Sequence, residues 1–132
     1  MEAYLTTAVQ LIPFLAVGLI FAYYDCFCCK APSRDTLKMQ GKKKGVTVID
    51  CRSQSEWDAG HVDDSLAHVL LIPLPGLGTS SKLPADKDTP ILIHCAVGGR
   101  SARGKVILES MGYTDVVNSM TITGTEEALK AQ

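Results

Sequence analysis

Residues 91–101 read ILIHCAVGGRS, and the architecture of this 132-residue chain can be predicted outward from them. The first four residues form a short apolar run of the kind that fills a buried β-strand. After Ser101, apolar side chains recur at helical spacing as far as Met111, and Gly112 is a typical helix terminator. A strand therefore leads directly into a short glycine-containing loop, and a helix follows the loop.

Short apolar runs typical of strands alternate with helical patterns along the rest of the chain from about Ala31. Strands are predicted at 46–49, 69–72, 91–94 and 115–118, and helices at 33–40, 53–60, 101–111 and 125–130. The second helix begins with a capping box, formed by Ser53 and Glu56, and residues 76–89 form a long polar connection. Strands that alternate with helices indicate a central parallel sheet with helices on both faces. The predicted fold class is therefore α/β, in three layers, over residues 31–132.

Cys95 directly follows the strand at 91–94, and ligands of such sheets bind outside the carboxyl ends of the strands. Gly98 and Gly99 allow the backbone to turn with its N–H groups pointing inward, as an anion-holding nest. The following helix points its positive end at the same place, and Arg100 adds a fork of hydrogen-bond donors. Because these groups stabilise a thiolate, the pattern predicts that Cys95 is an activated nucleophile. The alternative is a buried cysteine followed by an incidental turn, since cysteine is often buried.

The composition excludes several classes of protein. A formal net charge of −1 gives no electrostatic footprint for nucleic acid. The cysteines stand at positions 26, 28, 29, 51 and 95, and this odd, crowded set fits neither a disulfide framework nor a zinc site. The sequence therefore predicts free thiols in a reducing compartment, and no metal site.

An uncharged apolar span runs from Leu5 to Tyr24, and a helix of that length reaches about 30 Å, the thickness of a bilayer's hydrocarbon core. Basic residues outnumber acidic ones just after it, which predicts that the C-terminal side stays in the cytoplasm. We therefore expect residues 1–30 to be an apolar helix that anchors the chain as a single-pass membrane protein, and residues 31–132 to be a cytoplasmic domain. A cleaved secretory signal and a buried or interfacial helix are the alternatives. The cysteines at 26, 28 and 29 are candidates for palmitoylation.

Several short motifs outside the loop follow one another in the order typical of one family. They are Ile49-Asp50-Cys51-Arg52, Glu56-Trp57, Gly60-His61-Val62, Ile72-Pro73-Leu74, Gly112-Tyr113 and Asn118. Together with the Cys95 loop, they make residues 33–132 resemble a single rhodanese domain, a thiosulfate sulfurtransferase-like module. The resemblance implies a rhodanese-like three-layer fold and the activity of a rhodanese-type sulfurtransferase.

The resemblance also implies a mechanism. Cys95 would take a sulfane sulfur from a donor such as thiosulfate, become a persulfide, and pass the sulfur to cyanide or to a cellular thiol. The implied substrate-binding residues are Ala96, Val97, Gly98, Gly99, Arg100 and Ser101. The loop backbone would hold the persulfide, and Arg100 would also orient the anionic donor. The family's chemistry needs no metal and no organic cofactor.

Residues outside the loop receive supporting roles from the same resemblance. Asp50 and Arg52 match a motif that braces the fold near the site, with Arg52 as a substrate-side cation in the alternative. His61 is expected to be structural rather than catalytic, and Trp57 to be a core residue. Cys51 lies one residue past a strand end and could in principle form a disulfide with a Cys95 persulfide.

Two rival functions remain at the level of sequence. Cysteine phosphatases and arsenate reductases share the His-Cys loop, but they have one more residue between Cys and Arg. The four residues between Cys95 and Arg100 make a tighter pocket, which suits a sulfur atom better than a tetrahedral phosphate. The second rival is a membrane-tethered rhodanese fold that is retained for binding and does not catalyse.

Overall fold

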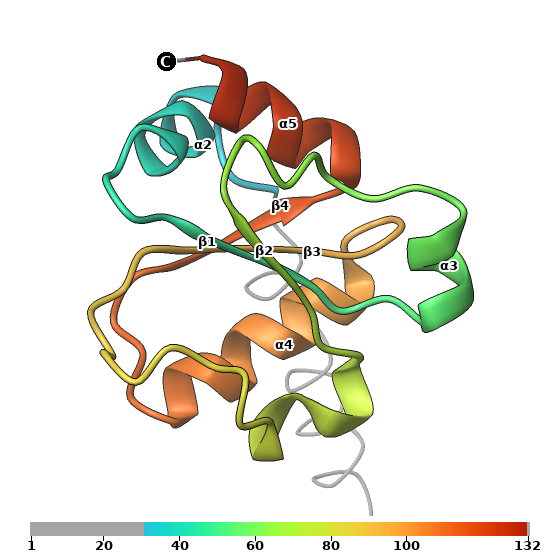
Figure 1. The fold of residues 1–132 in the computed structure, drawn as a ribbon. Helices are drawn as coiled ribbons and strands as arrows, with labels where there is room; N and C mark the ends of the chain where they lie inside the picture. The colour runs from blue at the N-terminus through green and yellow to red at the C-terminus, as the bar shows by residue number, and fades with distance from the viewer. Residues whose placement is uncertain (1–30, 132) are drawn as a thin grey trace, which may run out of the picture. The chain divides into compact units, whose positions relative to one another are not determined.

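The structure is a computed structural model, and it describes residues 31–131 (Figure 1). Its elements are α2 (Arg34–Gly41), β1 (Thr47–Asp50), α3 (Gln54–Asp58), β2 (His68–Leu71), the 3-10 helix η1 (Leu74–Thr79), β3 (Ile91–His94), α4 (Gly99–Ser110), β4 (Val116–Met120) and α5 (Ile122–Lys130). The predicted apolar helix and membrane anchor within residues 1–30 lie outside the described residues. Between residues 31 and 131, no helix is both long enough and apolar enough to cross a bilayer.

The four strands form one parallel sheet in the order β2-β1-β3-β4. The register of the two central strands pairs Thr47 with Ile91 and Asp50 with His94. Every residue of β1 and β3 is buried, as expected of strands that are covered on both faces. Because parallel strands end at one edge of the sheet, the residues that follow β1 and β3 emerge side by side.

Helices cover both faces of this sheet, and the predicted three-layer α/β fold is confirmed for the described residues. Figure 1 shows α2 and α5 on one face and α4 with η1 on the other. Successive side chains of β3 point to opposite faces of the sheet, so the strand contributes to two separate cores. Ile91 and Ile93 pack with Leu108 of α4, whereas Leu92 packs with Leu129 of α5. Each of these fully buried side chains contributes about 1.5–3 kcal/mol of hydrophobic stabilisation.

The cap of α3 is confirmed at the predicted position. The Ser53 hydroxyl accepts the N–H of Glu56 at 3.3 Å, and a Glu56 carboxylate oxygen accepts the N–H of Ser53 at 3.0 Å. This reciprocal pair satisfies two backbone donors that a helix start leaves free. The helix is short, with five residues and none of them buried, so its cap is a main source of its order.

Two helices begin earlier than the sequence predicts. Helix α4 starts at Gly99 because Gly98, at φ +94°, turns the chain straight from the loop into the helix. Helix α5 starts at Ile122 because the Thr121 hydroxyl caps it by accepting the N–H of Gly124 at 3.1 Å.

The connection predicted between residues 76 and 89 is only partly irregular. Its beginning belongs to η1, which has Pro75 in its first turn, where a missing N–H costs nothing. From η1, Leu77 is fully buried against the core below the sheet. This element is not predicted from the sequence, because two leucines among Pro and Gly leave no periodic signal.

Candidate active site

Cys95 is the first residue after β3 and is 1% exposed. Its sulfur faces back along the loop, where the N–H of Gly98 donates to Sγ at 3.0 Å. The Ser101 hydroxyl oxygen lies 3.5 Å from the same sulfur and 3.1 Å from the carbonyl oxygen of Gly98. The loop and the first turn of α4 thus surround one sulfur atom with hydrogen-bond donors.

These donors change the acidity of the Cys95 thiol. Burial alone would raise its pKa, but hydrogen bonds from the Ser101 hydroxyl and from the backbone N–H groups of Ser101, Val97 and Gly98 lower the pKa to about 7. A large fraction of the thiol is therefore ionised at neutral pH, and the thiolate is the reactive form. The arrangement has the chemical properties of the activated nucleophile that the sequence predicts.

Of the two glycines expected to shape the nest, only Gly98 is required by the geometry. Its positive φ is a conformation that other residues rarely adopt, and a side chain there would run into the thioether of Met120. Gly99 has an ordinary backbone conformation, and a Cβ added to it would meet open space. Gly99 therefore belongs to α4 as its first residue and is not needed for the turn.

The end of β4 holds the loop from the other side. Met120 has φ +70°, an uncommon value for a residue with a side chain, and its carbonyl accepts the N–H of Cys95 at 3.2 Å. Asn118 bridges the two segments, because its amide oxygen accepts the N–H of Met120 at 3.0 Å and its amide nitrogen donates to the Gly98 carbonyl at 3.3 Å. The strained residue is thus fixed by contacts with the loop it shapes.

Arg100 does not stand free beside the thiol. Its two terminal nitrogens donate to the two carboxylate oxygens of Glu56, each at 2.7 Å. These donors hold the pKa of the Glu56 carboxyl well below its usual range. Glu56 was not among the candidate site residues, although the capping box had already singled it out. A contact between residues 44 positions apart leaves no trace in local sequence patterns.

Asp50 and Arg52 form a buried ion pair below the loop. The Arg52 guanidinium donates to the Asp50 carboxylate through Nε at 2.9 Å and Nη2 at 2.7 Å, and Nη2 also donates to the Gly60 carbonyl at 2.8 Å. The Asp50 side chain is fully buried and that of Arg52 is 8% exposed. This geometry directs the charge of Arg52 inward, where it joins the end of β1 to Gly60.

His94, next to Cys95, is a buried polar residue to which the sequence analysis gave no role. Its Nδ1 lies 3.4 Å from the Cys95 carbonyl oxygen, and its Nε2 lies 3.8 Å from an Asp50 carboxylate oxygen, too far for a hydrogen bond. Burial lowers the pKa of His94, and the Asp50 charge opposes this only in part. We conclude that His94 is a neutral imidazole in the wall behind the thiol.

The prediction that Trp57 is a core residue is wrong. Its side chain is half-buried, and its ring stacks on the ring of His61 with the centroids 4.0 Å apart and the planes 6° apart. Helix α3 has no buried residue, so it does not carry Trp57 into the core. The indole instead packs on the His61 ring at the surface. His61 is exposed, and its Nδ1 lies 3.2 Å from the Trp57 carbonyl oxygen, which places it in a surface cluster.

The tip of the loop is apolar and open to solvent. Ala96 is exposed, and Val97 is 79% exposed, although it follows the buried Cys95 by only two residues. Their side chains point away from the sulfur while the backbone faces it. The structure therefore brings together Cys95, the backbone of the loop and Ser101, and it leaves His61 in the separate surface cluster with Trp57.

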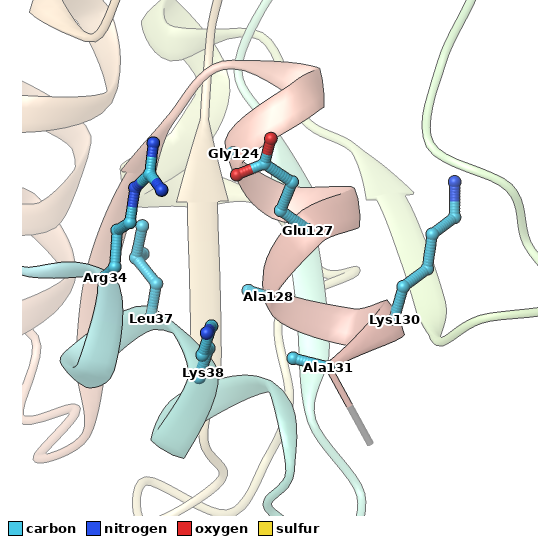
Figure 2. A pocket seen from close by; sticks show the side chains of 8 residues that line it. All are labelled: Arg34, Leu37, Lys38, Gly124, Glu127, Ala128, Lys130 and Ala131. Atoms are coloured by element: carbon cyan, nitrogen blue, oxygen red, sulfur yellow. The ribbon is translucent and has the colours of Figure 1, made fainter.

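A cleft of about 410 Å³ lies elsewhere, between α2 and α5. Figure 2 shows the charged side chains of Arg34, Lys38, Glu127 and Lys130 around it. It contains no thiol or imidazole, and its helices cover the face of the sheet opposite to α4. This cleft is therefore separate from the Cys95 thiol.

Comparison with known proteins supplies a family for this arrangement. The model of the rhodanese-like domain family matches residues 33–120. A curated relative, the thiosulfate sulfurtransferase GlpE of Pseudomonas fluorescens (strain SBW25), is 29% identical over 75 residues, which are 57% of this chain and 64% of the relative. The chain thus spans a little less than two thirds of the length of that relative.

Solved structures agree with this match. A rhodanese-like domain protein from Staphylococcus aureus is 28% identical with a TM-score of 0.56, over 74% of this chain and 90% of that one. A rhodanese with anions from E. coli is 28% identical with a TM-score of 0.53, over 60% of this chain and 89% of that one.

Proposed function

Because the chain belongs to the rhodanese-like domain family, we propose that it is a sulfurtransferase that carries a sulfane sulfur on Cys95 as a persulfide. The observation that carries the proposal is the thiol itself, which has a pKa of about 7 inside a loop of hydrogen-bond donors. The name of the curated relative supports thiosulfate as the class of donor. No cofactor is needed, because both half-reactions are displacements at sulfur.

In the first half-reaction, the Cys95 thiolate attacks the outer sulfur of thiosulfate. A sulfur–sulfur bond forms to Sγ, the bond within thiosulfate breaks, and sulfite leaves with the electron pair. The N–H groups of Val97 and Gly98 that face Sγ are also placed to stabilise the negative charge of the new outer sulfur.

In the second half-reaction, an acceptor attacks the outer sulfur of the persulfide. With cyanide the product is thiocyanate, and with a thiolate it is a new persulfide. The Cys95 thiolate is the leaving group in both cases, and a low pKa makes it a good one. The same donors that activate the nucleophile therefore also help it to leave.

Arg100 is the residue we assign to orienting the anionic donor. Its side chain is 39% exposed, so a donor can reach the guanidinium from solvent while Glu56 holds its other edge. Ionic contact with Glu56 fixes the direction of the guanidinium but reduces its net attraction for an anion. Binding of the donor is therefore expected to be selective in geometry and moderate in strength.

We also propose that residues 5–24 anchor this domain at the cytoplasmic side of a membrane. Support comes from the uncharged span and from the basic residues after it. Full-length protein should stay with the membrane fraction after carbonate extraction. Recovery in the soluble fraction would count against the anchor and would leave the chemistry of Cys95 untouched.

Mass spectrometry after treatment with thiosulfate tests the proposed function. The wild-type protein should gain the mass of one sulfur atom on Cys95, the Cys95→Ser variant should gain none at that position, and cyanide should remove the added sulfur as thiocyanate. A phosphatase would instead hydrolyse a phenyl phosphate without forming cyanolysable sulfur, and that result would exclude the proposal. A binding module would show neither reaction.

A further inference from the structure

Cys51 and Cys95 occupy neighbouring positions on adjacent strands. Asp50 of β1 pairs with His94 of β3, so the next residue of each strand is a cysteine. The ladder continues into this position, because the N–H of Cys51 donates to the His94 carbonyl at 3.0 Å. Adjacent strands lie about 4.8 Å apart, which falls inside the range of about 4.4–6.8 Å between the Cα atoms of a disulfide.

The two side chains also point to the same face of the sheet. Ile49 and Ile93, two residues earlier on each strand, lie in the core on the α4 side, and Cys51 and Cys95 belong to that same core. A spacing of two along a strand returns the side chain to the same face. Both cysteines are free thiols, and each is 1% exposed.

The environments of the two thiols are unequal. Cys51 donates from Sγ to the His94 carbonyl oxygen at 3.1 Å and has no ring of donors around it. Burial first, and the nearby charge of Cys95 second, raise the pKa of the Cys51 thiol to about 12. Cys51 is thus the protonated neighbour of an ionised Cys95.

Resting on the proposed function, we propose that Cys51 is an internal acceptor, which attacks Sγ of a persulfide on Cys95, releases the outer sulfur as sulfide, and leaves a Cys51–Cys95 disulfide. This step gives the protein a second activity. When no external acceptor takes the outer sulfur of the Cys95 persulfide, the protein releases that sulfur as sulfide.

The step balances without an outside oxidant. Cys51 loses its proton, its sulfur forms a bond to Sγ of Cys95, and the bond from Sγ to the outer sulfur breaks. The outer sulfur takes the electron pair and the proton and leaves as hydrosulfide. The sulfane sulfur is reduced to sulfide, and the two cysteine sulfurs are oxidised to a disulfide. An external dithiol must then reduce the disulfide before Cys95 can accept sulfur again.

The surroundings of Cys95 separate the attacking group from the leaving group. Cys51 approaches from the adjacent strand, whereas the N–H of Gly98 faces Sγ from the loop. A sulfur held by the loop donors is stabilised as it acquires negative charge. The displacement therefore has an attacker on the sheet side and a charge-stabilising site on the loop side.

The step should be slow at neutral pH, because only the thiolate of Cys51 attacks. Below the Cys51 pKa of about 12, its rate should rise about tenfold per pH unit. Formation of the persulfide should instead level off above pH of about 7, where Cys95 is already ionised. Above neutral pH, the first rate therefore keeps rising while the second stays constant, and this difference identifies the two steps separately.

The test uses full-length protein in which Cys26, Cys28 and Cys29 are replaced by serine, so that Cys51 and Cys95 are the remaining thiols. The protein is loaded with thiosulfate near neutral pH, freed of donor by gel filtration, and moved to alkaline pH. Sulfide is then measured over time, and tryptic peptides 45–52 and 88–100 are analysed without reduction. We expect close to one equivalent of sulfide and a disulfide that links the two peptides.

The matched control adds Cys51→Ser, since a serine hydroxyl can keep the hydrogen bond to the His94 carbonyl. Its persulfide should persist on peptide 88–100 with little release of sulfide. Cys51→Ala is the second control, to be used if Cys51→Ser folds poorly, and the same result is expected of it. An equal lifetime of the persulfide with and without Cys51 would overturn the inference. If both Cys51 variants fold and neither forms a persulfide with thiosulfate, the proposed function is overturned, and the inference with it. A rate that is independent of protein concentration would show that the step is intramolecular.

Discussion

Arg100 and Glu56 form a two-pronged ion pair, with both nitrogen–oxygen distances at 2.7 Å, that ties the Cys95 loop to the cap of α3. The same carboxylate accepts the N–H of Ser53, so one side chain serves a helix start and the loop together. The orientation of the cation beside the thiol is therefore set by a helix that lies far away in the sequence.

Replacing Glu56 with Gln should change the binding of the donor more than the fold. Glutamine at this position can still accept the N–H of Ser53, so the capping box survives. Loss of the negative charge strengthens the attraction of Arg100 for an anionic donor, and the KM for thiosulfate should fall by about two- to fivefold, an electrostatic effect that salt screens. The matched control Glu56→Asp keeps the charge and should not lower KM. A raised KM in Glu56→Gln would show that alignment of Arg100 matters more than its net charge.

Removing the Ser101 hydroxyl should shift the pH profile of persulfide formation upward. The rate follows the thiolate form of Cys95, so it rises with pH and levels off above the pKa of about 7. The hydroxyl is among the donors that lower this pKa, and Ser101→Ala should therefore move the midpoint to higher pH. Rates of reaction with iodoacetamide measured against pH would report it. Ser110→Ala on the same helix, where the hydroxyl bonds only the Ile107 carbonyl, should leave the midpoint in place.

The two glycines of the loop should respond differently to alanine. At Gly98, the left-handed backbone and the close thioether of Met120 make a side chain costly, and Gly98→Ala should lower the free energy of unfolding by about 1–3 kcal/mol. It should also slow persulfide formation, because a backbone displaced by the clash with Met120 would move the N–H of residue 98 away from the sulfur. Gly99→Ala should be tolerated, since nothing lies near its added methyl group. Urea unfolding of both variants checks this, and equal losses of stability would contradict it.

Breaking the buried pair of Asp50 and Arg52 should be strongly destabilising. Asp50→Asn leaves the Arg52 charge buried without its partner, a change that costs about 3–5 kcal/mol in such pairs. Urea unfolding would measure the loss. Glu109→Gln, which breaks the exposed pair with Lys105, should cost no more than about 0.5 kcal/mol. A small loss in Asp50→Asn would mean that water reaches the guanidinium.

Much of the fold could be predicted because its signals are local. Four apolar runs marked the four parallel strands, and the Ser53–Glu56 pattern marked the start of α3. The starts of α4 and α5 were misplaced by two or three residues, since they depend on a left-handed glycine and on a threonine cap, whose conformations the sequence pattern does not reveal. Element η1 was missed because its two core contacts, Leu74 and Leu77, stand among Pro and Gly and form no longer periodic pattern.

The site was predictable at its centre and much less so around it. A strand, a cysteine and a glycine turn stand next to one another in the sequence, and their geometry follows from that order. The ion pair of Glu56 with Arg100 and the bridge from Asn118 to Gly98 join distant segments, so only the folded chain reveals them. Trp57 was misplaced because an aromatic side chain predicts burial but does not identify the neighbour that covers it, which here is the ring of His61.

The contacts of Asn118 and Met120 with the loop should also determine when Cys95 becomes reactive during synthesis of the chain. The ribosome makes the loop first, and the residues of β4 that hold it follow some twenty positions later. Until those residues have emerged and paired with β3, the loop lacks its brace, and the nascent chain carries Cys95 as an ordinary thiol. A purified polypeptide that ends before Val116 should accordingly react with iodoacetamide at the rate of a free cysteine, and the chain that includes β4 and α5 at the faster rate of the finished protein. Protection of the nascent chain from early sulfur chemistry thus follows from the order in which its parts are made.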